Sequence, residues 1–181
     1  MTTIVYKDGI LATDSRLSMD GTLISDSNIK AVKSKKYLVA ASGLAGLCDL
    51  FLEWGRNDFE DIYKPEVQTH VEIGDFEGIA IDKKGNVTSY DLNWMPTIIG
   101  QVEMYVSGSG GDVARGAMMM GADVITAIEC AIKVDMNSGG PIQVFEFKKA
   151  SKKLNKPKRK PKKVAKRKLQ LVAKNKKKNA R

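Results

Sequence analysis

The sequence has few cysteines, a single histidine and no long apolar run, and each shortage excludes a class of site or location. Cys48 and Cys130 are the only cysteines among 181 residues, and without CxxC spacing they predict neither a disulfide framework nor a zinc site. His70 is the sole histidine, which excludes a multi-histidine metal site. A Ser-His-Asp triad would have to use this residue, but its polar neighbours Gln68 and Thr69 favour a surface position. We therefore expect neither a metal nor another cofactor.

Long hydrophobic stretches are also lacking. No run approaches the roughly 18 apolar residues that a membrane span needs, and no charged-then-apolar signal segment opens the chain. With two reduced cysteines, this pattern predicts an intracellular, cytoplasmic protein without a membrane partner.

Acidic and aromatic residues are missing from the C-terminal segment. The chain has 30 Lys and Arg against 21 Asp and Glu; 18 of the basic residues and none of the acidic ones lie in 148–181, which leaves 12 basic and 21 acidic residues in 1–147. The net charge is thus −9 for the body and +18 for the tail. A segment of one charge sign with few large apolar residues cannot bury enough surface to offset its chain entropy. We expect one domain over 1–147 and a disordered basic tail over 148–181.

The tail is suited to a polyanion, because dense unmixed positive charge contacts phosphates without reading bases. Nucleic acid, either DNA or RNA, ranks first. Acidic protein surfaces, the acidic bodies of neighbouring subunits, and a merely solvated tag are the alternatives. The residues expected to bind nucleic acid are Lys158, Arg159, Lys160, Lys162, Lys163, Lys166, Arg167 and Lys168.

Short strands and amphipathic helices alternate along the body. The β-branched runs at 2–6 and 10–13 flank an Asp-Gly pair typical of a tight hairpin. Further strands are predicted at 37–42, 77–81, 87–90, 103–107 and 141–147, and helices at 44–54, 112–120 and 122–133, with Gly55 as a stop signal. The segment 56–75 has no clear assignment. Strands at both ends around consecutive helices predict a layered α+β domain.

Thr2 is a candidate nucleophile. A small second residue allows removal of Met1, which would expose a free α-amine beside the Thr2 hydroxyl. With a reference pKa of about 7.7 to 8.0, this amine is partly neutral near pH 7 to 8 and could take the hydroxyl proton. The nucleophile and its base would then lie on one residue. By itself, however, an opening Met-Thr is common, and the dipeptide alone favours no function.

Asp14 and Lys30 are a candidate pair that supports this nucleophile. A buried lysine beside an N-terminal threonine would stabilise the hydroxyl's developing charge, and an aspartate would orient the lysine and keep it protonated. Alternatively, Asp14 caps a turn and Lys30 is a surface charge.

Two glycine-rich segments are ambiguous. Gly108-Ser109-Gly110-Gly111 precedes a predicted helix but matches neither GxxxxGK[ST] nor GxGxxG, so a nucleotide site is not indicated. The segment from Asp135 to Gly140, with Ser138, also has the composition of a plain turn.

Taken together, the order and spacing of these elements resemble the proteasome β-subunit family and its bacterial HslV-type relatives, which are N-terminal nucleophile hydrolases. The matching elements are Thr2-Thr3, Asp14-Ser15-Arg16, Lys30 sixteen residues later, Ala45-Gly46, Gly108-Ser109-Gly110, and Asp135-x-x-Ser138-Gly139-Gly140. The match extends over the body and not the tail. It implies a four-layer αββα sandwich.

The resemblance also implies site roles and an activity. Thr2 would attack a peptide carbonyl, Lys30 held by Asp14 would tune it, and Ser109, Asp135 and Ser138 would surround its amine. A backbone N–H near Gly46 would bind the oxyanion, with Gly43 as the competing candidate. The implied activity is that of a threonine endopeptidase acting on peptides or unfolded proteins.

Relatives form homo-oligomeric rings and are commonly served by an ATP-driven unfolding partner. The short 56–75 segment departs from the family's long helices, which puts a double ring in doubt. Two other functions stay open: a catalytically silent protein of this fold that serves as a structural or nucleic-acid-binding component, and a small-molecule amidase.

Overall fold

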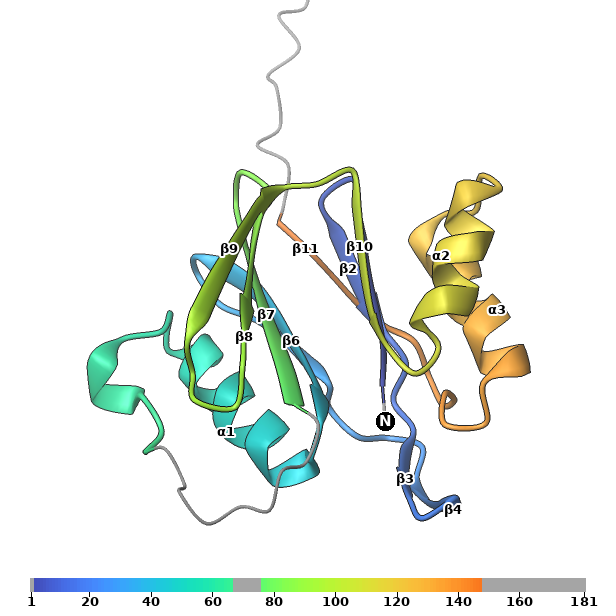
Figure 1. Ribbon diagram of the computed structural model, residues 1–181, viewed down its shortest axis with the longest axis horizontal. Coiled ribbons are helices and arrows are strands. Elements are labelled where there is room, and N and C mark those ends of the chain that lie inside the picture. Colours follow the sequence, from blue (N-terminus) through green and yellow to red (C-terminus); the bar gives the residue numbers. More distant parts are fainter. Residues whose placement is uncertain (1, 67–75, 148–181) are drawn as a thin grey trace, which may run out of the picture. The chain divides into compact units, whose positions relative to one another are not determined.

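The computed structural model describes residues 2–66 and 76–147. They form a hairpin and two larger antiparallel sheets, with α1 on one side and α2 and α3 on the other (Figure 1). The chain divides into two units, Met1–Lys148 and Lys149–Arg181, and the described residues belong to the first. The predicted boundary after residue 147 stays a prediction, and His70 lies outside the described residues.

The first sheet holds the N-terminal strand and has the order β10-β1-β2-β11. Its strands are β1 (Thr3–Lys7), β2 (Ile10–Thr13), β10 (Met104–Gly108) and β11 (Gln143–Glu146). Asp8 and Gly9 join β1 to β2 with positive φ values of 53° and 82°, as the Asp-Gly turn predicts. The hairpin places Ile4 opposite Thr13, so the start of β1 lies beside the end of β2.

The second sheet has the order β5-β6-β7-β8-β9. Its strands are β5 (Ala31–Lys33), β6 (Tyr37–Gly43), β7 (Phe76–Asp82), β8 (Asn86–Tyr90) and β9 (Pro96–Gln101). A separate hairpin consists of β3 (Leu17–Met19) and β4 (Thr22–Ser25). The sequence interpretation missed β3, β4, β5 and β9 and recovered the other strands.

Three helices and one short 3-10 helix complete the fold of the described residues. They are α1 (Ala45–Arg56), η1 (Asp61–Tyr63), α2 (Gly111–Met119) and α3 (Val124–Val134). The sequence predicts that Gly55 ends the first helix, but it lies inside α1, which continues to Arg56. A Cβ at Gly55 would come within 2.8 Å of Val39 on β6, so this glycine permits close packing of the helix on the sheet.

Three apolar clusters separate the layers. Ile4 and Leu38 belong to the cluster that contains residues of both sheets, whereas Val5 packs with residues of α2 and α3 and Val39 packs with residues of α1. Successive residues of β1 and β6 thus face opposite sides, as the two-residue period of a strand requires. The expected four-layer αββα sandwich is confirmed.

Candidate active site

Thr2 and Thr3 lie at the beginning of β1, between β2 and β10. Both residues are buried, and Thr2 is 4% exposed. Thr3 is opposite Gly108 in the sheet register, and a Cβ at Gly108 would collide with the carbonyl oxygen of Thr2. Glycine is therefore required there both for this approach and for its φ of 85°.

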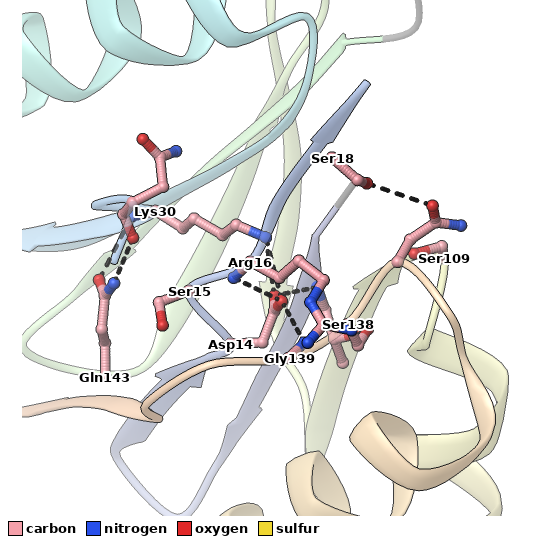
Figure 2. A network of polar contacts seen from close by, with 12 residues as sticks. Asp14, Ser15, Arg16, Ser18, Lys30, Ser109, Ser138, Gly139 and Gln143 are labelled. Carbon is pink, nitrogen blue, oxygen red and sulfur yellow. Dashed lines mark hydrogen bonds and ion pairs between the residues drawn. The ribbon is translucent and has the colours of Figure 1, made fainter. Parts of the chain in front are cut away.

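Asp14 is the centre of a buried polar network just after β2 (Figure 2). Its Oδ1 accepts a hydrogen bond from the Thr3 backbone N–H at 2.9 Å. Its Oδ2 accepts one from the Gly139 N–H at 3.0 Å and one from the Arg16 N–H at 3.2 Å. Lys30 Nζ lies 3.0 Å from Oδ1 and 3.1 Å from Oδ2. The network joins the start of β1, the end of β2 and the segment before β11.

The Lys30 side chain is 4% exposed in this ion pair and that of Asp14 is fully buried. Burial lowers the pKa of Lys30 below the ordinary lysine value, although its charge interaction and hydrogen bond with Asp14 act in the opposite direction. Asp14 therefore does both things that the sequence left open: it pairs with a buried Lys30, and it caps the turn to Arg16 through its Oδ2. The alternative of a surface lysine is wrong.

Ser109, Asp135 and Ser138 form a second polar group beside Thr3. The hydroxyls of Ser109 and Ser138 each donate to Asp135 Oδ2 at 2.6 Å. The Ser138 Oγ also lies 2.5 Å from Thr3 Oγ1. Burial acts to raise the pKa of Asp135, but hydrogen bonds from Ser109, Ser138 and Asn137 outweigh it, so the pKa is lowered.

Gly110 lets this second group come close to β1. A Cβ on Gly110 would collide with Thr3 Oγ1 and lie 2.9 Å from Ser138 Oγ. The glycines of the Gly108-Ser109-Gly110 segment therefore allow β1 to pack closely against it. This packing explains why glycine is needed there without invoking a bound nucleotide.

A pocket of about 370 Å³ opens beside Thr2. Its lining residues come from the two sheets and from the segment that follows β10: Thr2, Ser42, Gly43, Phe76, Glu77, Ser107, Gly108 and Ser109. Gly43 lies on the pocket wall, whereas Gly46 is an exposed residue in the first turn of α1 and does not line it. The first backbone N–H groups of a helix have no partner within it, and Leu44, at the N-cap, makes no side-chain capping bond.

The sequence interpretation assigned no role to two residues that build this site, Arg16 and Glu77. Arg16 donates through Nε to Asp26 at 2.9 Å and through Nη1 to the Met136 carbonyl. Its place directly after Asp14-Ser15 was an available signal. Glu77 is the first residue of the strand predicted at 77–81, and the sequence of that strand gives no indication that its side chain lines a pocket.

Among residues 2–66 and 76–147, no group of three or more His, Cys, Asp or Glu side chains could hold a metal ion. No helix within these residues is long and apolar enough to cross a bilayer. The eight tail residues proposed for nucleic acid, Lys158 through Lys168, lie outside the described residues.

Comparison with known proteins shows the fold. No protein-family model matches the sequence, and no curated protein is significantly similar to it. Among solved structures, HslV from Trypanosoma brucei superposes with a TM-score of 0.59 at 14% identity, over 81% of this chain and 100% of the other. The chain has the HslV/proteasome-type fold.

A second neighbour belongs to the same structural group. BPH of Thiobacillus denitrificans in complex with Epoxomicin matches with a TM-score of 0.55 at 18% identity, over 81% of this chain and 97% of that protein. BPH without that compound superposes with a TM-score of 0.52 at 19% identity, over 81% of this chain and 96% of that protein. These HslV/proteasome-type neighbours confirm the fold that the spaced sequence motifs predict.

Proposed function

We propose that this protein is a threonine-type endopeptidase whose nucleophile is the hydroxyl of Thr2 after removal of Met1. One observation carries the proposal: Thr3 links the start of β1 to both polar groups. Its N–H donates to Asp14 and its hydroxyl is hydrogen-bonded to Ser138, so both polar groups fix the backbone next to Thr2. Thr2 itself lines the pocket with Ser109.

The chemistry would use groups of this chain alone. The Thr2 amine takes the proton of the hydroxyl, whose oxygen attacks the carbonyl carbon of a peptide and forms a tetrahedral oxyanion. Collapse breaks the C–N bond, the proton passes to the departing amine, and an ester with Thr2 remains. Water, deprotonated by the same amine, then hydrolyses the ester and releases the acid. Lys30 would stabilise the negative charge as it develops on the threonine oxygen.

Backbone N–H groups of the turn between β6 and α1 would bind the oxyanion. Preorganised donors of this kind are often the largest single contribution to acyl transfer. Gly43 is favoured by its place on the pocket wall, and Gly46 remains the second candidate because an N–H in the first helical turn has no helical partner.

Intact mass and a single substitution test the proposal. The isolated protein should lack Met1 and should cleave unstructured peptides; Thr2→Ala should abolish cleavage, while Thr97→Ala, at an exposed threonine of β9, should not. Retention of Met1 would block the proposed nucleophile, and activity in the Thr2→Ala protein would assign it to another group.

We further propose that residues 148–181 bind DNA or another polyanion. The support is their charge: 18 basic residues in 34 with no acid. If about ten of these charges contact duplex DNA, log K should fall with log salt with a slope near nine. Deleting 148–181 should remove binding at low salt, whereas unchanged binding would refute the role. Competition of RNA and of an acidic protein against the bound DNA identifies the preferred partner.

We also propose a homo-oligomeric ring. Apolar side chains are exposed at the end of α2, where Met119 is 73% and Met120 89% exposed, and exposed apolar patches mark contact surfaces. Light scattering should give the mass of several subunits; a monomer at micromolar concentration would contradict the ring. An ATP-driven unfolding partner would be required only if folded proteins resist cleavage while unstructured peptides do not.

A further inference from the structure

Glu77 places a negative charge in the pocket beside Thr2. It is the one charged residue among the pocket-lining residues that the structure describes. The other lining groups are hydroxyls, glycines and the ring of Phe76. A carboxylate that lines an open pocket is available to a ligand unless the protein neutralises it.

The Glu77 side chain is held by the opposite sheet. Glu77 belongs to β7 and is paired with Ser42 of β6. Its Oε1 accepts a hydrogen bond from the Tyr105 hydroxyl and its Oε2 accepts one from Ser107. Tyr105 and Ser107 lie two residues apart on β10 and therefore face the same side of their sheet. Two oxygens bonded to two donors fix the orientation of the carboxylate.

These contacts orient the charge without cancelling it, because both donors are neutral hydroxyls. Burial, together with the hydrogen bond and the charge of Glu77, raises the pKa of Tyr105, so the phenol stays a neutral donor. Of the three ion pairs within residues 2–66 and 76–147, none includes Glu77. Two carboxylate oxygens offer about four acceptor positions, so acceptor capacity remains for a ligand.

We propose that Glu77 makes this pocket select a basic side chain, lysine or arginine, of the bound peptide. The inference rests on the proposed peptidase function and names the substrate class of that site. Hydrogen bonds that join two charged groups are roughly twice as strong as neutral ones, and the partly enclosed pocket screens them less than water does. A peptide with an acidic residue at the same position would be repelled.

Binding tests the selection independently of cleavage. In a Thr2→Ala background, fluorescent peptides that differ only in lysine, norleucine or glutamate at one position are titrated by anisotropy, and the position is scanned along the peptide. At one position lysine should bind roughly tenfold to a hundredfold more tightly than norleucine, with glutamate weakest. Adding Glu77→Gln should remove most of this preference. Equal affinities, or a preference that survives Glu77→Gln, would overturn the inference.

Two further variants control for charge and folding. Glu146→Gln removes the same charge from an exposed position on β11 and should keep the lysine preference. Ser107→Ala removes one hydrogen-bond donor while leaving the carboxylate, and should also keep the sign of the preference. Thermal melting verifies that each variant is folded.

Cleavage assays separate this inference from the proposed function. With Thr2 intact, the ratio of kcat/KM for the lysine peptide to kcat/KM for the norleucine peptide should be similar to the ratio of their affinities. This ratio should fall in the Glu77→Gln variant. No cleavage of any peptide would contradict the peptidase proposal, while the binding preference would still decide the role of Glu77. An equal loss of activity towards both peptides would show a structural role and overturn the inference.

Discussion

The polar network around Asp14 and the aromatic cluster beneath α1 fill two parts of the interior with opposite chemistry. In the network, a fully buried carboxylate is bonded by Lys30 and by the N–H groups of Thr3, Arg16 and Gly139. In the cluster, Phe51 lies 5.1–6.3 Å, between ring centroids, from five other rings: Trp54, Phe59, Phe76, Tyr90 and Trp94. The network depends on every partner being present, whereas the cluster gains stability from area and shape.

The two regions should therefore respond differently to substitution. A lost ring in the cluster should reduce the stability and leave the chemistry of Thr2 in place. A lost partner in the network should affect both stability and chemistry, because the same hydrogen bonds hold Thr3 and orient Lys30.

The largest stability effect is expected for Phe51→Ala. Removing this fully buried ring should lower the free energy of unfolding by about 3–5 kcal/mol, as measured by urea denaturation. Tyr63→Ala, at a half-exposed ring of η1, should cost less than about 0.5 kcal/mol. A loss below about 1 kcal/mol for Phe51→Ala would show that the cluster is not the stabilising region.

Lys30→Met should lower the free energy of unfolding by about 3 kcal/mol, because it leaves the buried Asp14 charge without its counter-ion. It should also abolish the peptide cleavage that we propose for Thr2, which Phe51→Ala should preserve at temperatures where it is folded. Lys33→Met, at an exposed residue of β5, is the matched control.

The double variant Asp14→Asn/Lys30→Met should be less destabilised than the sum of the two single changes. Strict additivity of the changes in the free energy of unfolding would contradict a coupled pair.

The difference between the regions also explains what the sequence could predict. Asp14 lies just after β2 and Lys30 just before β5. Their fixed spacing along the sequence is part of the ordered motifs that resemble the family, so that resemblance identifies them although the pair alone is ambiguous. The aromatic cluster joins α1 to Phe59, Phe76, Tyr90 and Trp94, which no local period connects. Segment 56–75 has no assignment from the sequence for this reason: the ring of Phe59 packs on Tyr37, Phe51, Trp54 and Tyr90, contacts that no local pattern indicates.

The missed strands have separate physical causes. In the β3–β4 hairpin, Asp20 and Gly21 with φ of 50° and 77° are an Asp-Gly turn signal that was present, but β4 is largely exposed and lacks apolar alternation. β9 begins with Pro96 and lies at a sheet edge, where proline is tolerated although it weakens a strand prediction.

Gly110→Ala should give a smaller effect that sharpens the account of the network. The added Cβ collides with Thr3 Oγ1 and crowds Ser138, which should cost about 1–3 kcal/mol and reduce activity. Gly116 lies inside α2, the helix that Gly110 precedes as N-cap, and has open space around its Cβ position. Gly116→Ala should instead be neutral or stabilise by up to about 1 kcal/mol. Equal effects at both glycines, by thermal melting, would argue against the close approach.

The smallest effect is a pH dependence that arises from Asp135. Because the pKa of Asp135 is lowered in the folded protein, its contribution to stability is present above the unfolded aspartate pKa of about 3.9 and is lost as the pH falls through the folded value. Between pH 5 and 3, the wild-type protein should therefore lose more stability than Asp135→Asn. Parallel curves for the two proteins would contradict the hydrogen-bonded carboxylate.

The proposal that Thr2 is the nucleophile can be tested by finding which residue reacts with a threonine-directed electrophile. The protein is treated with epoxomicin, the compound bound in the Thiobacillus denitrificans BPH neighbour, and the modified peptide is sequenced by tandem mass spectrometry. We expect a single adduct on an N-terminal Thr2 in the wild-type protein and no adduct in the Lys30→Met variant. An adduct on any other residue, or an unmodified Thr2 preceded by Met1, would contradict it.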